Sequence, residues 1–535
     1  MKKSHAPQQV LGKTKSPMKD FPTEFLALVF KFTHEHSLTI VESTPDVRSQ
    51  PGNVYRYKPS YLARQVEHSC MAQGPDRVDV QEHAVPSIFY ILHDIRRVCK
   101  RWKSTIETTP EFHSRIVVDL DEKKGPLSSR LKKQLKKALD VPLDVFITRG
   151  SKDSDKDLTH SENATAATVM KILGPTIPQC RSFVVDVKYG TSLPLLSQYL
   201  RGSAEHLRIL KLQCEIDDED EDKDLPEVPK LASDLDLPVL SIVALDGVTF
   251  PDACRIQSFT DQFKYLSLDI LSIGNLSVPV NEDFDLYTLL EHLCTFGYIR
   301  HLIVENILAG CDPGTIEGGE YQINVDCVTL IGHDLEFTEE FFLGNFGGTF
   351  CYWHIDGSGI SENSVPMAHH LRLENIPDVP DNDWHGALTR YFGNRLDIID
   401  CKDFSDEHLD IIANNCEPLR RLYLIDCPNI TVKGLKVMIT RREELIAVQD
   451  EEDDETEDED DSADSDAESL IECTSDDDTL IGVGYEAFHG HWEDPRRTSP
   501  YRPIHRLCVK GHPTKKLSKV DQNWFKKRVK SFQWK

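Results

Sequence analysis

Residues 396–405 read LDIIDCKDFS, and residues 422–431 read LYLIDCPNIT. The two stretches align position by position at a spacing of 26 residues. Both have aliphatic residues at the first and third positions and a cysteine at the sixth. Alternate residues of a strand point to opposite faces, so the aliphatic pair predicts a short strand with one buried face. Ser405 and Thr431 end the two stretches and are placed to cap helices that return the chain to the next strand.

The same pattern extends toward the N-terminus. Leu371-Arg372-Leu373 stands 25 residues before Leu396. Many gaps between strand-like segments are 22–27 residues, and others are stretched to 33–40. A period in the twenties with L-x-L strands is typical of a leucine-rich-repeat solenoid. The other strand-like cores are residues 118–120, 145–147, 184–187, 210–212, 243–245, 266–268, 302–304 and 327–330.

We therefore predict an α/β chain: a leucine-rich-repeat solenoid with irregular repeats at 118–449, preceded by a small all-α helical module. The alternative is a doubly wound α/β domain, in which strands and helices also alternate. The 14 cysteines are dispersed and include no CxxC pair. This pattern predicts reduced, buried thiols, and neither a disulfide framework nor a zinc site.

The charged residues are unevenly distributed along the rest of the chain. The net charge of -28 argues against non-specific binding to nucleic acid or anionic membranes, because both are polyanions. Residues 1–19 carry five Lys and no acid, and we expect a disordered basic N-terminus. Residues 450–478 carry 18 acids and no base, which predicts a disordered acidic loop. Order should return at 479–535, with a terminal repeat and a basic C-terminal cap.

One basic residue precedes the first strand leucine in each late repeat: His370, Arg395, Arg421 and Arg506. If the repeats stack in register, these residues form a column on one edge or face of the sheet. Such a column could hold an acidic or phosphorylated segment of a target protein, or the chain's own residues 450–478. The alternative is that they are scattered basic residues facing solvent.

Two N-terminal stretches carry a family resemblance. Residues 21–26 read FPTEFL, and residues 98–116 read VCKRWKSTIETTPEFHSRI. These stretches resemble the opening and closing halves of an F-box, in the form common in the large fungal F-box families. The resemblance places an F-box-like helical module at 20–117, with residues 42–86 as a loop inserted between its helices. The alternative is an ordinary helical hairpin packed on its own domain.

In that family the motif binds the Skp-type adaptor of a cullin–RING ubiquitin ligase. The resemblance implies that the adaptor-facing or supporting apolar residues are Phe21, Pro22, Leu26, Phe30, Val98 and Trp102.

No catalytic motif stands out: there is no GxSxG, P-loop or HExxH pattern. We therefore predict a substrate receptor with no catalytic residues, cofactor or metal of its own, which binds the adaptor and an unidentified target protein. Nucleic acid and membrane are not expected partners, and the expected location is cytoplasmic or nuclear. The alternatives are a repeat scaffold without a ligase role, and a histone or basic-protein chaperone that uses the acidic loop.

Overall fold

The computed structural model describes residues 26–28, 97–121, 127–149, 159–216, 235–277, 285–308, 321–344, 350–365, 368–379, 382–455, 501–513 and 516–535. The loop predicted at 42–86, the N-terminus predicted at 1–19 and the stretch 456–500 lie outside these residues. None of the helices among the described residues combines the length and the apolar character needed to cross a bilayer.

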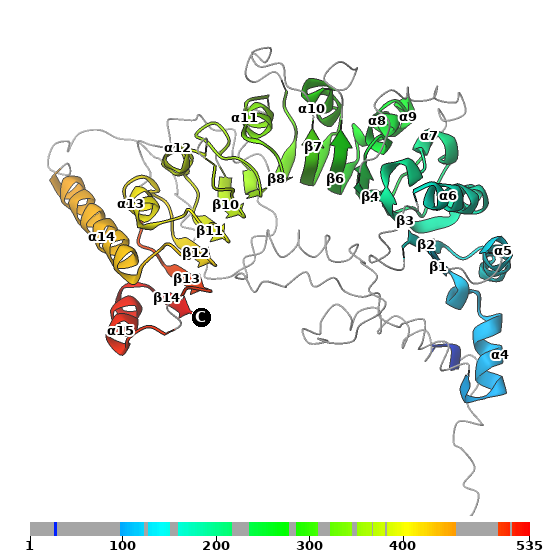
Figure 1. Cartoon of the computed structure of the whole chain (residues 1–535), viewed down its shortest axis with the longest axis horizontal. Helices are drawn as coiled ribbons and strands as arrows, with labels where there is room; N and C mark the ends of the chain where they lie inside the picture. The colour runs from blue at the N-terminus through cyan, green and yellow to red at the C-terminus, as the bar shows by residue number, and fades with distance from the viewer. Residues whose placement is uncertain are drawn as a thin grey trace, which may run out of the picture.

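The described chain forms one 14-stranded sheet, in which every strand pairs in parallel with the next strand in the sequence. The strands line the inner side of an arch, and the helices lie along its outer side (Figure 1). The strands are β1 (Arg115–Asp119), β2 (Leu143–Thr148), β3 (Cys180–Tyr189), β4 (Ile209–Ile216), β5 (Ile242–Asp246), β6 (Ser267–Ser277), β7 (Tyr298–Leu308), β8 (Val325–Ile331), β9 (Phe350–Asp356), β10 (Ala368–Glu374), β11 (Arg395–Ile399), β12 (Arg421–Ile425), β13 (Arg506–Lys510) and β14 (Ser531–Trp534).

Helices connect most successive strands on the outer side. They are α5 (Leu127–Ala138), α6 (Thr159–Leu173), α7 (Leu196–Tyr199), α8 (Thr249–Cys254), α9 (Gln257–Phe263), α10 (Leu286–Cys294), α11 (Leu335–Gly344), α12 (Trp384–Thr389), α13 (Asp406–Asn415), α14 (Val432–Glu455) and α15 (Lys519–Arg528). Helix α4 (Lys100–Thr108) precedes β1. Short 3-10 helices are η2 (Pro110–His113), η3 (Gly174–Gln179) and η4 (Gly190–Ser192).

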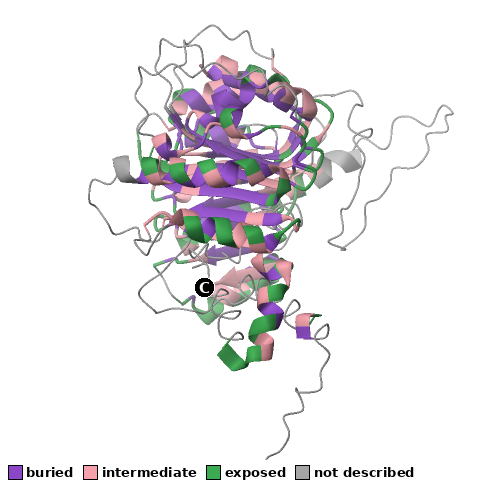
Figure 2. Cartoon of the chain, turned by 90° about the vertical axis from the view of Figure 1, so that its right-hand side faces the viewer, coloured by how far each residue is buried: buried purple, intermediate pink, exposed green. Residues whose placement is uncertain are grey.

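The pairing register confirms the 26-residue spacing. Leu396 is the register partner of Leu422, and Leu371 is the partner of Leu396. These leucines lie in one continuous hydrophobic core between the sheet and the helices. Buried residues accordingly run along the stacked strands in Figure 2. A doubly wound sheet has a reversal in strand order, whereas this order is sequential, so that alternative is wrong for the described residues. A sequential parallel sheet is compatible with a solenoid-like repeat.

A left-handed residue marks the end of each late strand. Asn375, Asp400 and Asp426 have φ angles of 50°, 51° and 54°, and Gly511 has 66°. The backbone N–H of each one donates to a carbonyl at the end of the next strand, as from Asp400 N to Ile425 O at 2.8 Å; the acceptor of Gly511 is Lys535, directly after β14. Asn, Asp and Gly are the residues that tolerate this region of backbone space. The turn is therefore a repeated feature that holds neighbouring strands in register.

The expected helix starts are confirmed. Ser405 is the N-cap of α13, and the side chain of Thr431 accepts a hydrogen bond from Gly434 N at the start of α14. Ser518 caps α15 through a bond from Asp521 N. The C-terminal segment adds β13, α15 and β14 to the end of the sheet, where a terminal repeat was predicted.

Three sequence predictions need correction. Helix α14 continues through Glu455, so disorder starting at residue 450 is wrong for residues 450–455. The in-register core of β6 is not at 266–268, because Leu271 is the partner of both Val243 and Leu302. Strand β9 was missed, because Trp353 occupies the position that Val328 and Leu371 hold in the neighbouring strands.

The left-handed turn gives a stability prediction. We expect Asp400→Val to lower the free energy of unfolding by about 1–2 kcal/mol relative to Asp400→Gly, because a β-branched side chain is strained at a φ of 51°. Urea denaturation of the two variants measures the difference. The matched control is Lys402→Val, an exposed position nearby without a left-handed φ. Equal stability of the Val and Gly variants at residue 400 would contradict this role of the turn.

Candidate functional site

The inner face of the sheet carries the four predicted basic residues. The register pairs His370 with Arg395, Arg395 with Arg421, and Arg421 with Arg506. Neighbouring parallel strands lie about 4.8 Å apart, so these residues form a column across β10 to β13. They stand next to the buried strand leucines and thus on the opposite, inner side of the strands.

Two members of this column already contact Asp397 of β11. Arg395 donates to both carboxylate oxygens of Asp397, at 3.0 and 2.9 Å, and His370 Nε2 lies 3.1 Å from Oδ2. Asp397 is only 1% exposed. Burial raises the pKa of Asp397, but the charges and hydrogen bonds of His370 and Arg395 hold that pKa well below its usual range. This half of the column is therefore an internal ion-pair network.

A second ion pair lies beside it, across β9 and β10. Arg372 donates from Nε to Glu374 at 2.9 Å, and His354 Nε2 lies 3.4 Å from the same carboxylate. Burial raises the pKa of Glu374, but the hydrogen bond from His354 and the charge of Arg372 bring it down to about 2. Burial and the nearby Arg372 lower the pKa of His354. Arg372 is therefore the cation that keeps Glu374 ionised.

Three possible metal ligands among the described residues also lie here, close enough together to hold an ion. Single ligand atoms of His354, Asp356 and Glu374 lie within 4.8 Å of one another. However, Glu374 pairs with Arg372, and Asn375 Nδ2 donates to Asp356 Oδ1 at 2.7 Å. A metal ion would have to displace a bonded guanidinium, so this donor set does not favour one.

The other half of the column has a different environment. The guanidinium of Arg506 lies 5.4 Å from the ring centre of Tyr423, and that of Arg395 lies 4.7 Å from it. Tyr423 on β12 is therefore flanked by two cations from the neighbouring strands. Arg421 and Arg506 have no acidic partner among the described residues, in contrast to Arg395.

Farther toward the N-terminus, the inner face contains an apolar cluster across β4 to β8. Ile242, Ile270 and Ile303 form a buried cluster, with Ile209 and Ile331 packed against it. Ile209, Ile242 and Ile270 are register partners on β4, β5 and β6. Because the three central isoleucines are buried, they offer little apolar surface to a partner.

The structure also brings together parts of the predicted N-terminal module. Leu26, Ile106 and Phe112 form a small hydrophobic cluster, and Trp102 packs against it. Val98 is 60% exposed. Phe21, Pro22 and Phe30 lie outside the described residues. The predicted adaptor-facing residues therefore include two that support a cluster, Leu26 and Trp102, and one on the surface, Val98.

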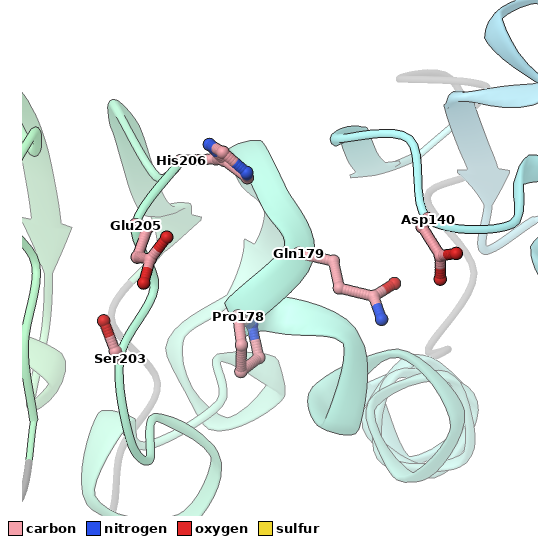
Figure 3. A pocket seen from close by; sticks show the side chains of 6 residues that line it. All are labelled: Asp140, Pro178, Gln179, Ser203, Glu205 and His206. Carbon is pink, nitrogen blue, oxygen red and sulfur yellow. The ribbon is translucent and has the colours of Figure 1, made fainter.

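A surface hollow in the described chain lies before β2, β3 and β4 (Figure 3). Its lining residues are Asp140, Pro178, Gln179, Ser203, Glu205 and His206. In Figure 3 the side chain of Gln179 extends toward Asp140, whereas His206 points away from both. Side chains that do not converge on one point do not form a reaction centre, so we assign no chemistry to this hollow.

Sequence reasoning missed the residues that give the inner face its charge pattern. Arg372, Asp397 and Tyr423 stand between the two aliphatic residues of β10, β11 and β12, respectively. The period of two along a strand was the signal that could have found them. Without the register, however, the pairing of Asp397 with His370 on the neighbouring strand could not be inferred.

Comparison with protein family models finds no match for this chain, and comparison with curated proteins finds none either.

The Asp397 network predicts an asymmetric mutational response. We expect Asp397→Ala to lower the free energy of unfolding by about 3–5 kcal/mol, because it leaves Arg395 buried without a counter-ion. The double variant R395M/D397M should lose less stability than D397A alone, because it removes both charges. Chemical denaturation with circular dichroism measures both. A double variant as unstable as the single one would show that the charges do not act as a pair.

Two buried histidines predict a pH dependence of stability. Burial lowers the pKa of His301 and of His333 from 6.5 to about 4. His333 donates from Nε2 to Val304 O at 3.1 Å, and His301 Nε2 lies 2.8 Å from Thr329 Oγ1. Between pH 4 and 6.5, these two histidines bind more protons in the unfolded chain than in the folded chain. The contribution of these two histidines to the free energy of unfolding should therefore rise from pH 4 to 6.5, by roughly 3 kcal/mol per histidine, and stay level above.

Denaturation of the wild type and of His333→Gln across this pH range measures the effect. The slope of stability against pH should be smaller in His333→Gln, whereas the exposed His385→Gln should keep the wild-type slope. Identical slopes in all three proteins would contradict a neutral buried His333.

Proposed function

We propose that this protein is the non-catalytic substrate receptor of a Skp–cullin–F-box ubiquitin ligase, with an F-box near its N-terminus and a leucine-rich-repeat solenoid after it. The F-box would bind the Skp-type adaptor, and the inner face of the repeats would bind a target protein. Such a receptor acts by proximity, because it raises the effective concentration of target lysines near the ubiquitin-loaded enzyme.

The observation that carries the adaptor side is the cluster of Leu26, Ile106 and Phe112. Leu26 belongs to the stretch that resembles the opening of an F-box, and the other two belong to the closing stretch. Contact between them supports one helical module despite the long separation in sequence. Val98, which the resemblance makes adaptor-facing, is 60% exposed and thus accessible to a partner.

The repeat side is supported by the cysteine position of the 26-residue repeat. Cys401 Sγ lies 3.2 Å from Ile399 O and 3.7 Å from Leu373 O of the preceding strand. Cys427 Sγ lies 3.4 Å from Ile425 O and 3.5 Å from Ile398 O of the preceding strand. Both thiols are buried. The same pair of carbonyl contacts, one in the own coil and one in the preceding coil, gives the cysteine a structural reason to recur, which supports a leucine-rich repeat of the cysteine-containing type.

The test is adaptor binding by a surface variant that leaves the cluster intact. We expect Val98→Asp to abolish pull-down of a Skp-type adaptor that the wild-type protein binds, because a charge would be buried in an apolar interface. The matched control is Val437→Asp on α14, an exposed apolar residue in another part of the fold.

Failure of the wild-type protein to bind the adaptor would reject the receptor proposal. The repeat-scaffold alternative would then be favoured, with α4 and η2 serving as a helical cap beside β1 and α5.

A further inference from the structure

A cluster of cations lies at the C-terminal end of the sheet, where β12, β13 and β14 begin. We call it the basic cluster; its members are Arg420, Arg421, Arg502, His505, Arg506 and Lys530. Three of them directly precede the first residue of a strand: Arg420, His505 and Lys530. Arg421 and Arg506 are themselves the first residues of β12 and β13.

Backbone pairing brings these residues side by side. His505 N donates to Arg420 O at 2.8 Å, and Ser531 N donates to His505 O at 2.8 Å. Arg421 is the register partner of Arg506. Five of the cations therefore lie in two short rows that run across adjacent strands, close enough for one extended ligand to contact several of them.

Electrostatics distinguish the cluster from the part of the column at His370 and Arg395. Burial lowers the pKa of His505, and the charges that lower it further are those of Arg420, Lys530, Arg421 and Arg502. Nearby ion pairs join Lys436 with Asp521 and Arg528 with Glu443. Within the described chain, Arg420, Arg421, Arg502 and Arg506 have no acidic partner.

Arg506 also has an unused donor. Its Nε is buried and has no hydrogen-bond acceptor in the described part of the chain. A buried donor without an acceptor is unfavourable. Its counterpart in β11, Arg395, uses the same atom to bond Asp397 at 3.0 Å. The position that Asp397 fills for Arg395 has an uncharged residue, Cys508, on β13.

We propose that the basic cluster binds an acidic peptide segment of the target protein, whose carboxylates take the place that Asp397 has beside Arg395. Arginine side chains bind carboxylates through paired hydrogen bonds, which gives geometric selectivity as well as attraction. That this peptide belongs to a ligase target rests on the proposed function; the binding itself does not. The chain's own acidic residues at 450–478 are a competing occupant that the test must separate.

The test is fluorescence anisotropy of the full-length protein with a fluorescein-labelled peptide of repeated Glu-Asp-Ser triplets. The matched probe replaces Glu by Gln and Asp by Asn. We expect R421E/R506E to bind the acidic probe at least about tenfold more weakly than the wild type, and added salt to weaken wild-type binding. The milder R421Q/R506Q variant should also bind more weakly, and it keeps the side-chain size if the charge reversal disturbs folding.

The control for net charge is K132E/K136E, which makes the same charge change on two exposed lysines of α5 at the other end of the sheet. This variant should keep wild-type affinity. Equal weakening in K132E/K136E, unchanged affinity in R421E/R506E, or equal binding of the uncharged probe would overturn the proposal.

Two further measurements separate the remaining outcomes. If the acidic probe binds only after deletion of residues 456–478, the cluster belongs to the chain's own acidic segment, which overturns the proposal of an external partner. Adaptor pull-down distinguishes this proposal from the proposed function. R421E/R506E should retain the adaptor, and Val98→Asp should retain the acidic probe.

Discussion

Each late strand is held to the next by a hydrogen bond from a left-handed residue at its end. Asn375 N donates to Ile399 O at 3.0 Å, and Asp400 N donates to Ile425 O at 2.8 Å. These bonds fix the register, and because side chains alternate along a strand, a slip of one residue would exchange the buried face for the inner face. The buried leucines and the column from His370 to Arg506 are therefore two consequences of one backbone constraint.

The fixed register lets the inner face vary while the core stays the same. The strand core pairs Leu396 with Leu422 and Leu422 with Leu507, whereas the residue between the core positions changes from Asp397 to Tyr423 to Cys508. With Asp397 present, the basic column is neutralised internally. Where that acid is replaced, the cations have no acidic partner in the described chain. From β11 to β13, whether the arginine has a counter-ion is thus decided by the residue two positions after it.

The sequence predicted the sheet best where repeats keep the leucine pattern, as at β10 to β13. It failed at β9, where Trp353 lies in register with Val328 and Leu371, because a pattern based on aliphatic residues does not detect an aromatic residue in the same core position. The basic column could be predicted, since the spacing of the late repeats in the sequence is enough to align its four residues. The neutralisation of His370 and Arg395 could not, because it depends on one buried carboxylate whose partners come from two strands. The helix through Glu455 was missed because acidic composition alone suggested disorder.

The receptor proposal requires two binding regions that act together on one chain: the helical module around Trp102 and the basic cluster around Arg506. The most direct measurement is titration of the preformed complex of this protein and a Skp-type adaptor with the labelled acidic peptide, followed by size-exclusion chromatography. The proposal predicts co-elution of all three components, and the same peptide affinity with and without the adaptor. Displacement of the adaptor by the peptide, or failure of the adaptor to form the first complex, would contradict it.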